Sequence, residues 1–224
     1  MDGGGCGGNH IHHLTIFRMS EIANKEPITE QDYIDAAQEL GCKVAAIKAV
    51  AEVESSGSGF LPTGELVILF EPHIFWKRLK KYGEDPATIL RLHPEAAEIL
   101  YEKFKGHAGE HPSQQWDRLR KAANLPYAGA MNAAYESASF GKFQVMGFNH
   151  KAAGYATVFE FIHDLELGES YHLKAFVNLV KDFGLSKFLA AENWTGFAGS
   201  WNGPAYKVNK YDTKMAEAFK KFIA

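Results

Sequence analysis

The chain has 224 residues, a length that suits one well-packed domain, and its 46% hydrophobic and 23% charged residues are typical of a globular protein. A formal net charge of -3 gives no electrostatic reason to expect a nucleic-acid partner. No apolar run approaches the roughly 20 residues that cross a membrane. Cys6 and Cys42 are the only cysteines, which excludes a disulfide framework and fits synthesis in a reducing compartment.

Residues 1–25 differ in composition from the rest of the chain. "MDGGGCGGNHIHHL" is rich in glycine and shows no apolar periodicity, as a flexible leader would. It lacks the basic segment followed by an apolar core of a secretory signal, so we expect no signal peptide. The alternative is a transition-metal site. Its ligands would be Cys6, His10, His12 and His13.

From Thr29 onward the pattern is mostly helical. Thr29 and Asp32 have the spacing of a capping box, and an apolar stripe follows until Gly41. A second stripe leads to Glu54, and "ELVILFE" (65–71) predicts a short buried strand. We expect further helices over residues 72–83, 86–104, 112–124, 128–137, 142–153, 157–167, 170–183, 186–198 and 205–223. The sequence therefore predicts a mainly α-helical domain with a small β element.

Two glutamates, Glu52 and Glu54, end the second stripe directly before "SSGSG". Glu54 lies seven residues after Ile47 and four after Val50, so it shares their buried face. Glu52 lies four residues after Lys48, the spacing of a solvent-exposed ion pair. Burial and the helix C-terminus both raise the pKa of Glu54 toward the range that a general acid needs. The alternative is a helix-terminal glutamate bonded to the serine turn.

Glu71 has the opposite environment. It ends the predicted strand and precedes Pro72 at a helix N-terminus, where the helix dipole favours an ionised carboxyl. A protonated Glu54 and an ionised Glu71 would suit the acid and the base of glycoside cleavage. The alternative for Glu71 is a residue that anchors the start of the helix.

Three segments carry a resemblance to known proteins. "VESSGSGF", "ESASFGKFQVMGFNH" and "WNGPAYKVNKY" hold, in order, the Glu-Ser, Gly-x-x-Gln-x-Met and aromatic-Asn-Gly patterns of goose-type lysozymes and lytic transglycosylases. With "VILFEPHIFW" they resemble more closely the N-acetylmuramidase domain of phage endolysins, over about residues 27–224. The resemblance implies a lysozyme-like helical fold with a small β-hairpin, in a catalytic domain that we place at 26–224.

By this resemblance Glu54 is the general acid. The candidate substrate-binding residues are Ser139, Gly141, Gln144, Trp201, Asn202 and Tyr206. Phe143 could also stack on a sugar, with core packing as its alternative, and Phe140 departs from the family by replacing a common tryptophan. Glu136 precedes a serine beside the groove motif and joins Glu71 as a candidate for the second carboxylate, with a role as the general acid in place of Glu54 as its alternative.

The leading interpretation is a bacteriolytic muramidase that hydrolyses the β-1,4 bond between N-acetylmuramic acid and N-acetylglucosamine in peptidoglycan. A lytic transglycosylase, which leaves 1,6-anhydro products, and a non-catalytic wall-binding module are the alternatives. A metal-dependent amidase or peptidase is disfavoured because the ten histidines show no H-E-x-x-H spacing. The extra glutamates Glu71 and Glu136 favour water as the acceptor. We expect peptidoglycan strands as the partner and neither a metal nor an organic cofactor.

The last predicted helix is basic and amphipathic. From Ala205 onward lysines outnumber acidic residues, and Met215, Phe219 and Phe222 share one face. Such a helix can approach anionic membranes, whereas the alternative is a lysine-coated helix packed on the core. The resemblance further implies a monomer made in the cytoplasm of a bacterial host, which acts on the periplasmic wall after release.

Overall fold

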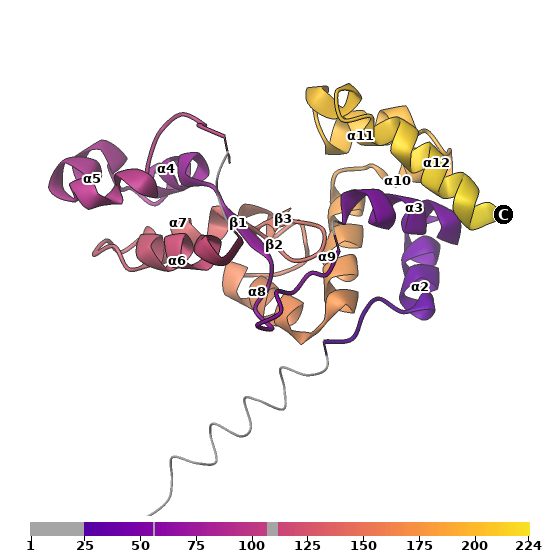
Figure 1. The fold of residues 1–224 in the computed structure, drawn as a ribbon, viewed down its shortest axis with the longest axis horizontal. Helices are drawn as coiled ribbons and strands as arrows, with labels where there is room; N and C mark the ends of the chain where they lie inside the picture. Colours follow the sequence, from indigo (N-terminus) through magenta and orange to yellow (C-terminus); the bar gives the residue numbers. More distant parts are fainter. Residues whose placement is uncertain (1–24, 56, 107–111) are drawn as a thin grey trace, which may run out of the picture.

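The fold of residues 25–55, 57–106 and 112–224 is described by a computed structural model (Figure 1). This part of the chain forms eleven α-helices, α2 to α12, and one three-stranded sheet. The predicted mainly α-helical fold with a small β element is thereby confirmed. The potential metal ligands Cys6, His10, His12 and His13 lie outside the described residues.

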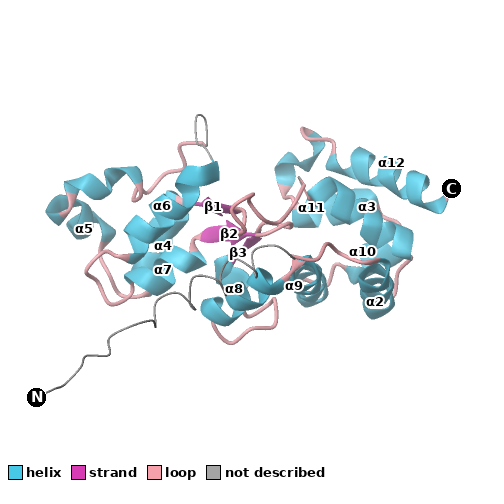
Figure 2. Ribbon diagram, turned by 60° about the horizontal axis from the view of Figure 1, so that its bottom comes forward, coloured by secondary structure: helices cyan, strands magenta, loops and turns pink. Residues whose placement is uncertain are grey.

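Two groups of helices flank the small sheet in both Figure 1 and Figure 2. One group consists of α4 (Pro72–Lys81), α5 (Pro86–Leu92), α6 (Pro112–Ala123) and α7 (Ala130–Glu136). The other consists of α2 (Glu30–Leu40), α3 (Val44–Glu54), α10 (Ser186–Ala190), α11 (Trp194–Trp201) and α12 (Tyr211–Ile223). Between the groups lie α8 (Val158–Leu167) and α9 (Glu169–Asp182).

The sheet is antiparallel, with strand order β1 (Ile68–Phe70), β2 (Ala138–Phe140), β3 (Val145–Met146). Ile68 pairs with Phe140, and Phe140 pairs with Val145. The helix predicted over 142–153 is therefore wrong, because this segment forms β3 and the short 3-10 helix η2 (Gly147–Asn149). Gly141 and Gln144 take the left-handed φ values of 71° and 47°, which close a tight turn between β2 and β3.

Helix ends follow the local sequence signals closely. The Thr29 and Asp32 capping box is present, and Gly41 ends α2 with a φ of 65°. The helix predicted over 86–104 instead stops at Leu92, because Pro94 cannot continue it and begins the 3-10 helix η1 (Pro94–Glu98).

Two other predicted helices are divided by residues with positive φ. Glu192, at 54°, separates α10 from α11 in the segment predicted as one helix over 186–198. Lys210, also at 54°, separates η3 (Pro204–Lys207) from α12 in the segment predicted over 205–223. The predicted strand 65–71 is shortened to the three residues of β1.

The C-terminal helix α12 packs its apolar face on α3. Met215 is 0% exposed, and Phe219 is buried with Ala218 against Ala45, Ala46 and Ala49 of α3. The two main apolar side chains of this face are therefore used in the core, as the packing alternative had it. No helix of the described part combines the length and the apolarity that crossing a membrane requires.

Candidate active site

Glu54 is the last residue of α3, and its partly buried side chain meets the end of α11. Asn202 Nδ2 donates to Oε1 of Glu54 at 3.1 Å and to Oε2 at 3.2 Å. Trp201 Nε1 donates to Oε2 at 3.3 Å. The "WN" pair of the aromatic-Asn-Gly pattern thus lies directly on the carboxyl that the sequence analysis singled out.

Burial raises the pKa of Glu54 above its ordinary value. The hydrogen bonds from Asn202 and Trp201 act in the opposite direction, because each donor stabilises the ionised carboxylate, but they do not cancel the effect of burial. The Glu54 carboxyl therefore stays protonated to a higher pH than a glutamate in water. When it loses its proton, the N–H groups of Asn202 and Trp201 stabilise the resulting carboxylate.

Glu52, two residues earlier, lies on the exposed side of α3. Its Oε2 pairs with Lys221 Nζ of α12 at 2.8 Å, whereas Lys48 pairs with Glu30 at 2.6 Å. The expected ion pair with Lys48 is therefore wrong in its partner, although the prediction that Glu52 is the exposed glutamate is confirmed. Glu52 and Glu54 differ in surroundings as the helical spacing predicted.

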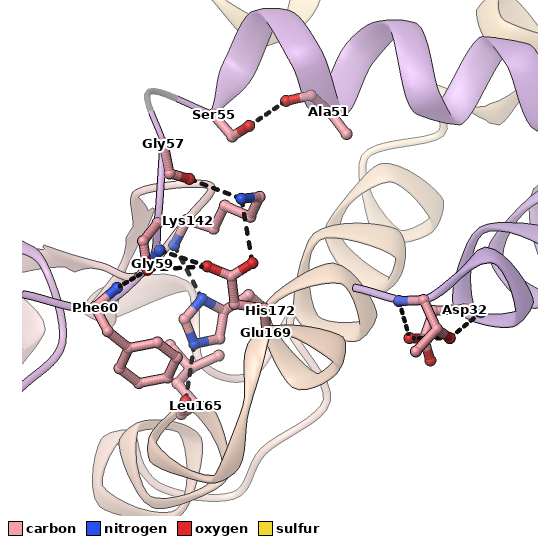
Figure 3. A network of polar contacts seen from close by, with 12 residues as sticks. Asp32, Ala51, Ser55, Gly57, Gly59, Phe60, Lys142, Leu165, Glu169 and His172 are labelled. Atoms are coloured by element: carbon pink, nitrogen blue, oxygen red, sulfur yellow. Dashed lines mark hydrogen bonds and ion pairs between the residues drawn. The ribbon is translucent and has the colours of Figure 1, made fainter. Parts of the chain in front are cut away.

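The segment after Glu54 is held by a polar network (Figure 3). Glu169, the first residue of α9, accepts hydrogen bonds through Oε1 from Gly59 N–H at 2.7 Å and from Ser58 Oγ at 3.3 Å. Lys142 Nζ lies 3.2 Å from Oε2 of Glu169 and donates to the carbonyl oxygen of Gly57 at 2.7 Å. The hairpin turn (141–144), the segment behind Glu54 in the chain (57–59) and the start of α9 therefore contact one another here.

His172 completes this network from the second turn of α9. Its Nδ1 accepts the N–H of Lys142 at 2.9 Å, so Nε2 carries the proton and donates to Leu165 O at 2.8 Å. Burial lowers the pKa of His172 to about 4, which keeps the ring neutral. A Cβ atom on Gly59 or Gly141 would lie only 2.5 or 2.6 Å from the imidazole, so both positions require glycine.

Gln144 and Ser139 stabilise the turn between β2 and β3. Ser139 Oγ donates to Gln144 Oε1 at 2.8 Å, and Gln144 Nε2 donates to the carbonyl oxygens of Gly141 at 2.7 Å and Val67 at 3.3 Å. These bonds hold Gln144 in its left-handed conformation. Of the predicted groove residues, Ser139, Gly141 and Gln144 therefore shape the hairpin turn.

The predicted aromatic residues lie on the side of Glu54. The Trp201 ring packs at 4.8 Å from Phe176 and at 6.2 Å from Phe197, and Tyr206 packs beside Gly199 of α11. Phe143 is buried and stacks on Phe176 at 4.7 Å, which agrees with the core-packing alternative for this residue.

The two other candidate carboxylates lie at the end of the sheet opposite the hairpin turn, where Glu71 follows β1 and Glu136 precedes β2. Glu136 is 3% exposed; its Oε2 accepts from Arg78 Nε at 2.6 Å and its Oε1 from Tyr82 OH at 2.8 Å. Glu71 Oε2 lies 3.3 Å from His73 Nδ1, just beyond the end of β1. Neither residue is among the hydrogen-bond partners of Glu54, which come from α11.

Sequence reasoning missed the roles of Lys142, Glu169 and His172. No spacing connects these residues, because they lie up to 30 positions apart and meet only in the folded chain. The one usable signal was the pair of glycines, Gly59 and Gly141, at which a side chain would collide with His172. Within the described ranges, no group of three or more His, Cys, Asp or Glu residues could hold a metal ion.

Comparisons with known proteins agree with this geometry. A sequence model of the N-acetylmuramidase family matches residues 43–223. The crystal structure of a Burkholderia AP3 phage endolysin is similar, with a TM-score of 0.78 and 36% sequence identity, and the match covers 89% of this chain and 73% of that chain. A comparison with curated proteins gives no match. The chain therefore belongs to the N-acetylmuramidase family, whose members are enzymes that cleave peptidoglycan.

Proposed function

We propose that this protein hydrolyses the β-1,4 bond between N-acetylmuramic acid and N-acetylglucosamine, with Glu54 as the general acid. The observation that carries the proposal is the Glu54 carboxyl itself, partly buried at the end of α3 and bonded to Trp201 and Asn202. The likeness to a phage endolysin supports synthesis in a bacterial host and action on its wall after release.

The chemistry follows from the surroundings of Glu54. Cleavage of a glycosidic bond requires a proton on the leaving oxygen while an oxocarbenium-like sugar forms. Burial favours the protonated acid before the reaction, and the donors of Asn202 and Trp201 stabilise the carboxylate that remains after proton transfer. Because these hydrogen bonds strengthen as negative charge develops, they favour the transition state over the ground state.

The groove residues divide into two groups in this proposal. Trp201, Asn202 and Tyr206 come from the α11 side, where an aromatic face and an amide can bind an amino sugar. Ser139, Gly141 and Gln144 act by setting the shape of the hairpin turn that faces the segment after Glu54, and Gly141 lets the turn pack against His172.

Glu71 and Glu136 stay candidates for the carboxylate that holds the attacking water. Their contacts, with His73 and with Arg78 and Tyr82, also provide each with a structural reason to be there. Single Gln replacements distinguish these roles. Replacement of the water-holding glutamate is expected to lower the rate of peptidoglycan cleavage at least about 100-fold, while the variant still binds saccharide. A structural residue is expected to change stability more than the rate of the folded enzyme.

Mass spectrometry of the fragments released from purified peptidoglycan tests the proposed reaction. Hydrolysis at the proposed bond leaves N-acetylmuramic acid at a reducing end, and Glu54→Gln is expected to release no such product. Glu52→Gln, two residues away on the exposed side of α3, is the matched control and should act as the wild type does. Products with 1,6-anhydro ends would identify a lytic transglycosylase, and a chain that binds wall material without releasing any fragment would be a binding module.

A further inference from the structure

Two buried polar residues and one partly buried lysine contact the segment that follows Glu54 and have no direct part in the proton transfer described above. They are Lys142, Glu169 and His172, which we call the polar cluster (Figure 3). Glu169 is 5% exposed and His172 1%. Burying a carboxylate and an ammonium costs free energy that their attraction often fails to recover, so stability alone is a weak reason for such a pair.

The polar cluster fixes the backbone just behind Glu54. Glu169 binds the N–H of Gly59, and Lys142 Nζ binds the carbonyl oxygen of Gly57, at 2.7 Å in each case. Gly57 lies three residues after Glu54, so these two bonds hold the chain where it leaves α3. Figure 3 shows Gly57 and Gly59 beside Lys142 and Glu169.

The cluster also fixes the hairpin turn on which Lys142 lies. His172 accepts the backbone N–H of Lys142, while Glu169 binds its ammonium group, so Lys142 is held at both ends by α9. The imidazole lies against both Gly59 and Gly141, which leaves no space for the segment and the turn to shift toward α9. These three side chains therefore add to the backbone hydrogen bonds from Val67 N–H to Gly59 O, at 2.9 Å, and from Gly141 N–H to Val67 O, at 2.8 Å, in setting the distance between residues 57–59 and the turn.

We propose that Lys142, Glu169 and His172 are positioning residues: they hold the hairpin turn and the segment behind Glu54 at a fixed separation, and so align the bound glycan with the acid. This inference rests on the proposed function, because it assigns the cluster a role in aligning the glycan with Glu54. In well-oriented reactions, a misplacement of about 1 Å costs on the order of 100-fold in rate, even when the change lies away from the reacting atoms.

The double variant Lys142→Met/Glu169→Gln tests the positioning role. It removes both charges together, so no unpaired charge stays in the cluster. The backbone N–H at position 142 can still bind His172, and the amide oxygen of the new glutamine can still accept the N–H of Gly59. We expect kcat on soluble glycan strands from purified peptidoglycan to fall at least about tenfold, with KM within about twofold, because alignment is lost while the sugar-binding surface remains. The single variant Lys142→Arg keeps Glu169 and a positive charge opposite it. Its kcat should therefore lie between those of the double variant and the wild type.

The matched control is Lys181→Met/Glu39→Gln, which removes a 2.7 Å pair between α9 and α2 that is about half exposed on each side. It should leave kcat and KM unchanged. Glu169→Gln alone is the second test variant. Wild-type kcat in a folded test variant would overturn the proposal, and so would loss of the fold in both, because the cluster would then be purely structural. The proposed function fails separately, if the wild-type enzyme releases no fragment with N-acetylmuramic acid at a reducing end.

Discussion

At the scale of single residues, Glu54 is subject to two opposing influences. Burial at the end of α3 favours the neutral acid, and the donors of Asn202 and Trp201 favour the carboxylate. A general acid needs both, because it must hold a proton before the reaction and release it during the reaction. The helical spacing from Ile47 and Val50 predicted the buried side of α3, whereas nothing local to Glu54 predicted its two partners on α11.

Replacing Glu54 by Gln is expected to lower the rate of wall digestion at least about 100-fold, because the proton donor is lost. Stability at pH 7 should not fall. Since the pKa of Glu54 is raised in the folded chain, its ionisation above the unfolded pKa disfavours folding, and the neutral amide removes this effect. Digestion of purified peptidoglycan and urea unfolding measure the two quantities. A variant that is both inactive and unfolded would contradict the expectation.

Replacing Trp201 by Phe is expected to shift the pH profile. The change keeps an aromatic ring against Phe176 but removes the Nε1–H donor to Glu54, so the pKa of Glu54 rises further. Because the acid must be protonated, the alkaline limb of kcat/KM should move to higher pH. Trp194→Phe, which alters a ring packed on Phe219, is the control and should leave the limb in place. A shift to lower pH would contradict this account of Glu54.

At the scale of elements, the hairpin β2–β3 and the start of α9 are where tertiary contacts outweigh local pattern. The segment 142–153 was predicted as a helix, but its residues Val145 and Met146 form β3 and pair with β2, which in turn pairs with β1, about 70 residues earlier. Helix starts marked by capping boxes or proline, by contrast, were largely predictable, since these signals act within one turn. The polar cluster could not be predicted from local sequence patterns either, because Lys142 lies 27 or more positions from Glu169 and His172 and contacts them only in the folded chain.

Gly141→Ala is expected to lower the free energy of unfolding by more than the usual cost of placing alanine in a left-handed conformation. The new Cβ would lie 2.6 Å from His172 Nδ1, so the imidazole or the turn must move. Gly184→Ala is the matched control, because Gly184 has a similar φ of 66° and no atom within 4 Å of the added Cβ. The control should lose about 1 kcal/mol of unfolding free energy and Gly141→Ala clearly more. Equal losses in urea unfolding would contradict the close packing of His172 on the turn.

His172 predicts a loss of stability in acid. Its pKa is about 4 in the folded chain and near 6.5 when unfolded, so between these values the unfolded state binds the proton first. Stability is therefore highest above pH 6.5 and should fall by up to roughly 3 kcal/mol as the pH approaches 4. Lys142 and Lys25 oppose protonation and Glu169 favours it, but burial dominates. The glutamine of His172→Gln can both accept and donate a hydrogen bond but does not titrate. Urea unfolding of this variant at several pH values should therefore lack the loss of stability that His172 causes between pH 6.5 and 4.

At the scale of the whole molecule, two helical groups meet around the sheet, and Glu54 lies at the end of a helix from one of them (Figure 1). Most helices and the partly buried position of Glu54 could be anticipated from the sequence, but the contacts of Glu71 and Glu136 could not. Both glutamates adjoin recognisable motifs, yet their side chains bind partners on α4 or at its start, such as Arg78, which is 58 positions from Glu136. Position beside a motif did not reveal the side-chain partners of either glutamate.

Removal of residues 1–24 is expected to leave the rate of peptidoglycan digestion close to that of the full chain, because this segment shows no apolar periodicity. The truncation should keep Lys25 and Glu26, since the Glu26 carbonyl accepts the N–H of Glu169 at 3.2 Å. A large loss of rate, or a loss restored by added zinc, would assign a role to Cys6, His10, His12 and His13.

The contact between α3 and the α11–α12 end of the chain has a consequence for biosynthesis. Glu54 and Asn202 are 148 positions apart, and Glu52 binds Lys221 across 169 positions. A ribosome therefore synthesises Glu54 long before it makes Trp201 and Asn202, whose side chains donate hydrogen bonds to it. Until α11 has emerged, Glu54 lacks both of its donors, and until α12 has emerged, α3 lacks the surface on which it packs. A nascent or prematurely terminated chain is thus expected to lack the assembled surroundings of Glu54, so the proposed activity should arise only when translation of this region is nearly complete.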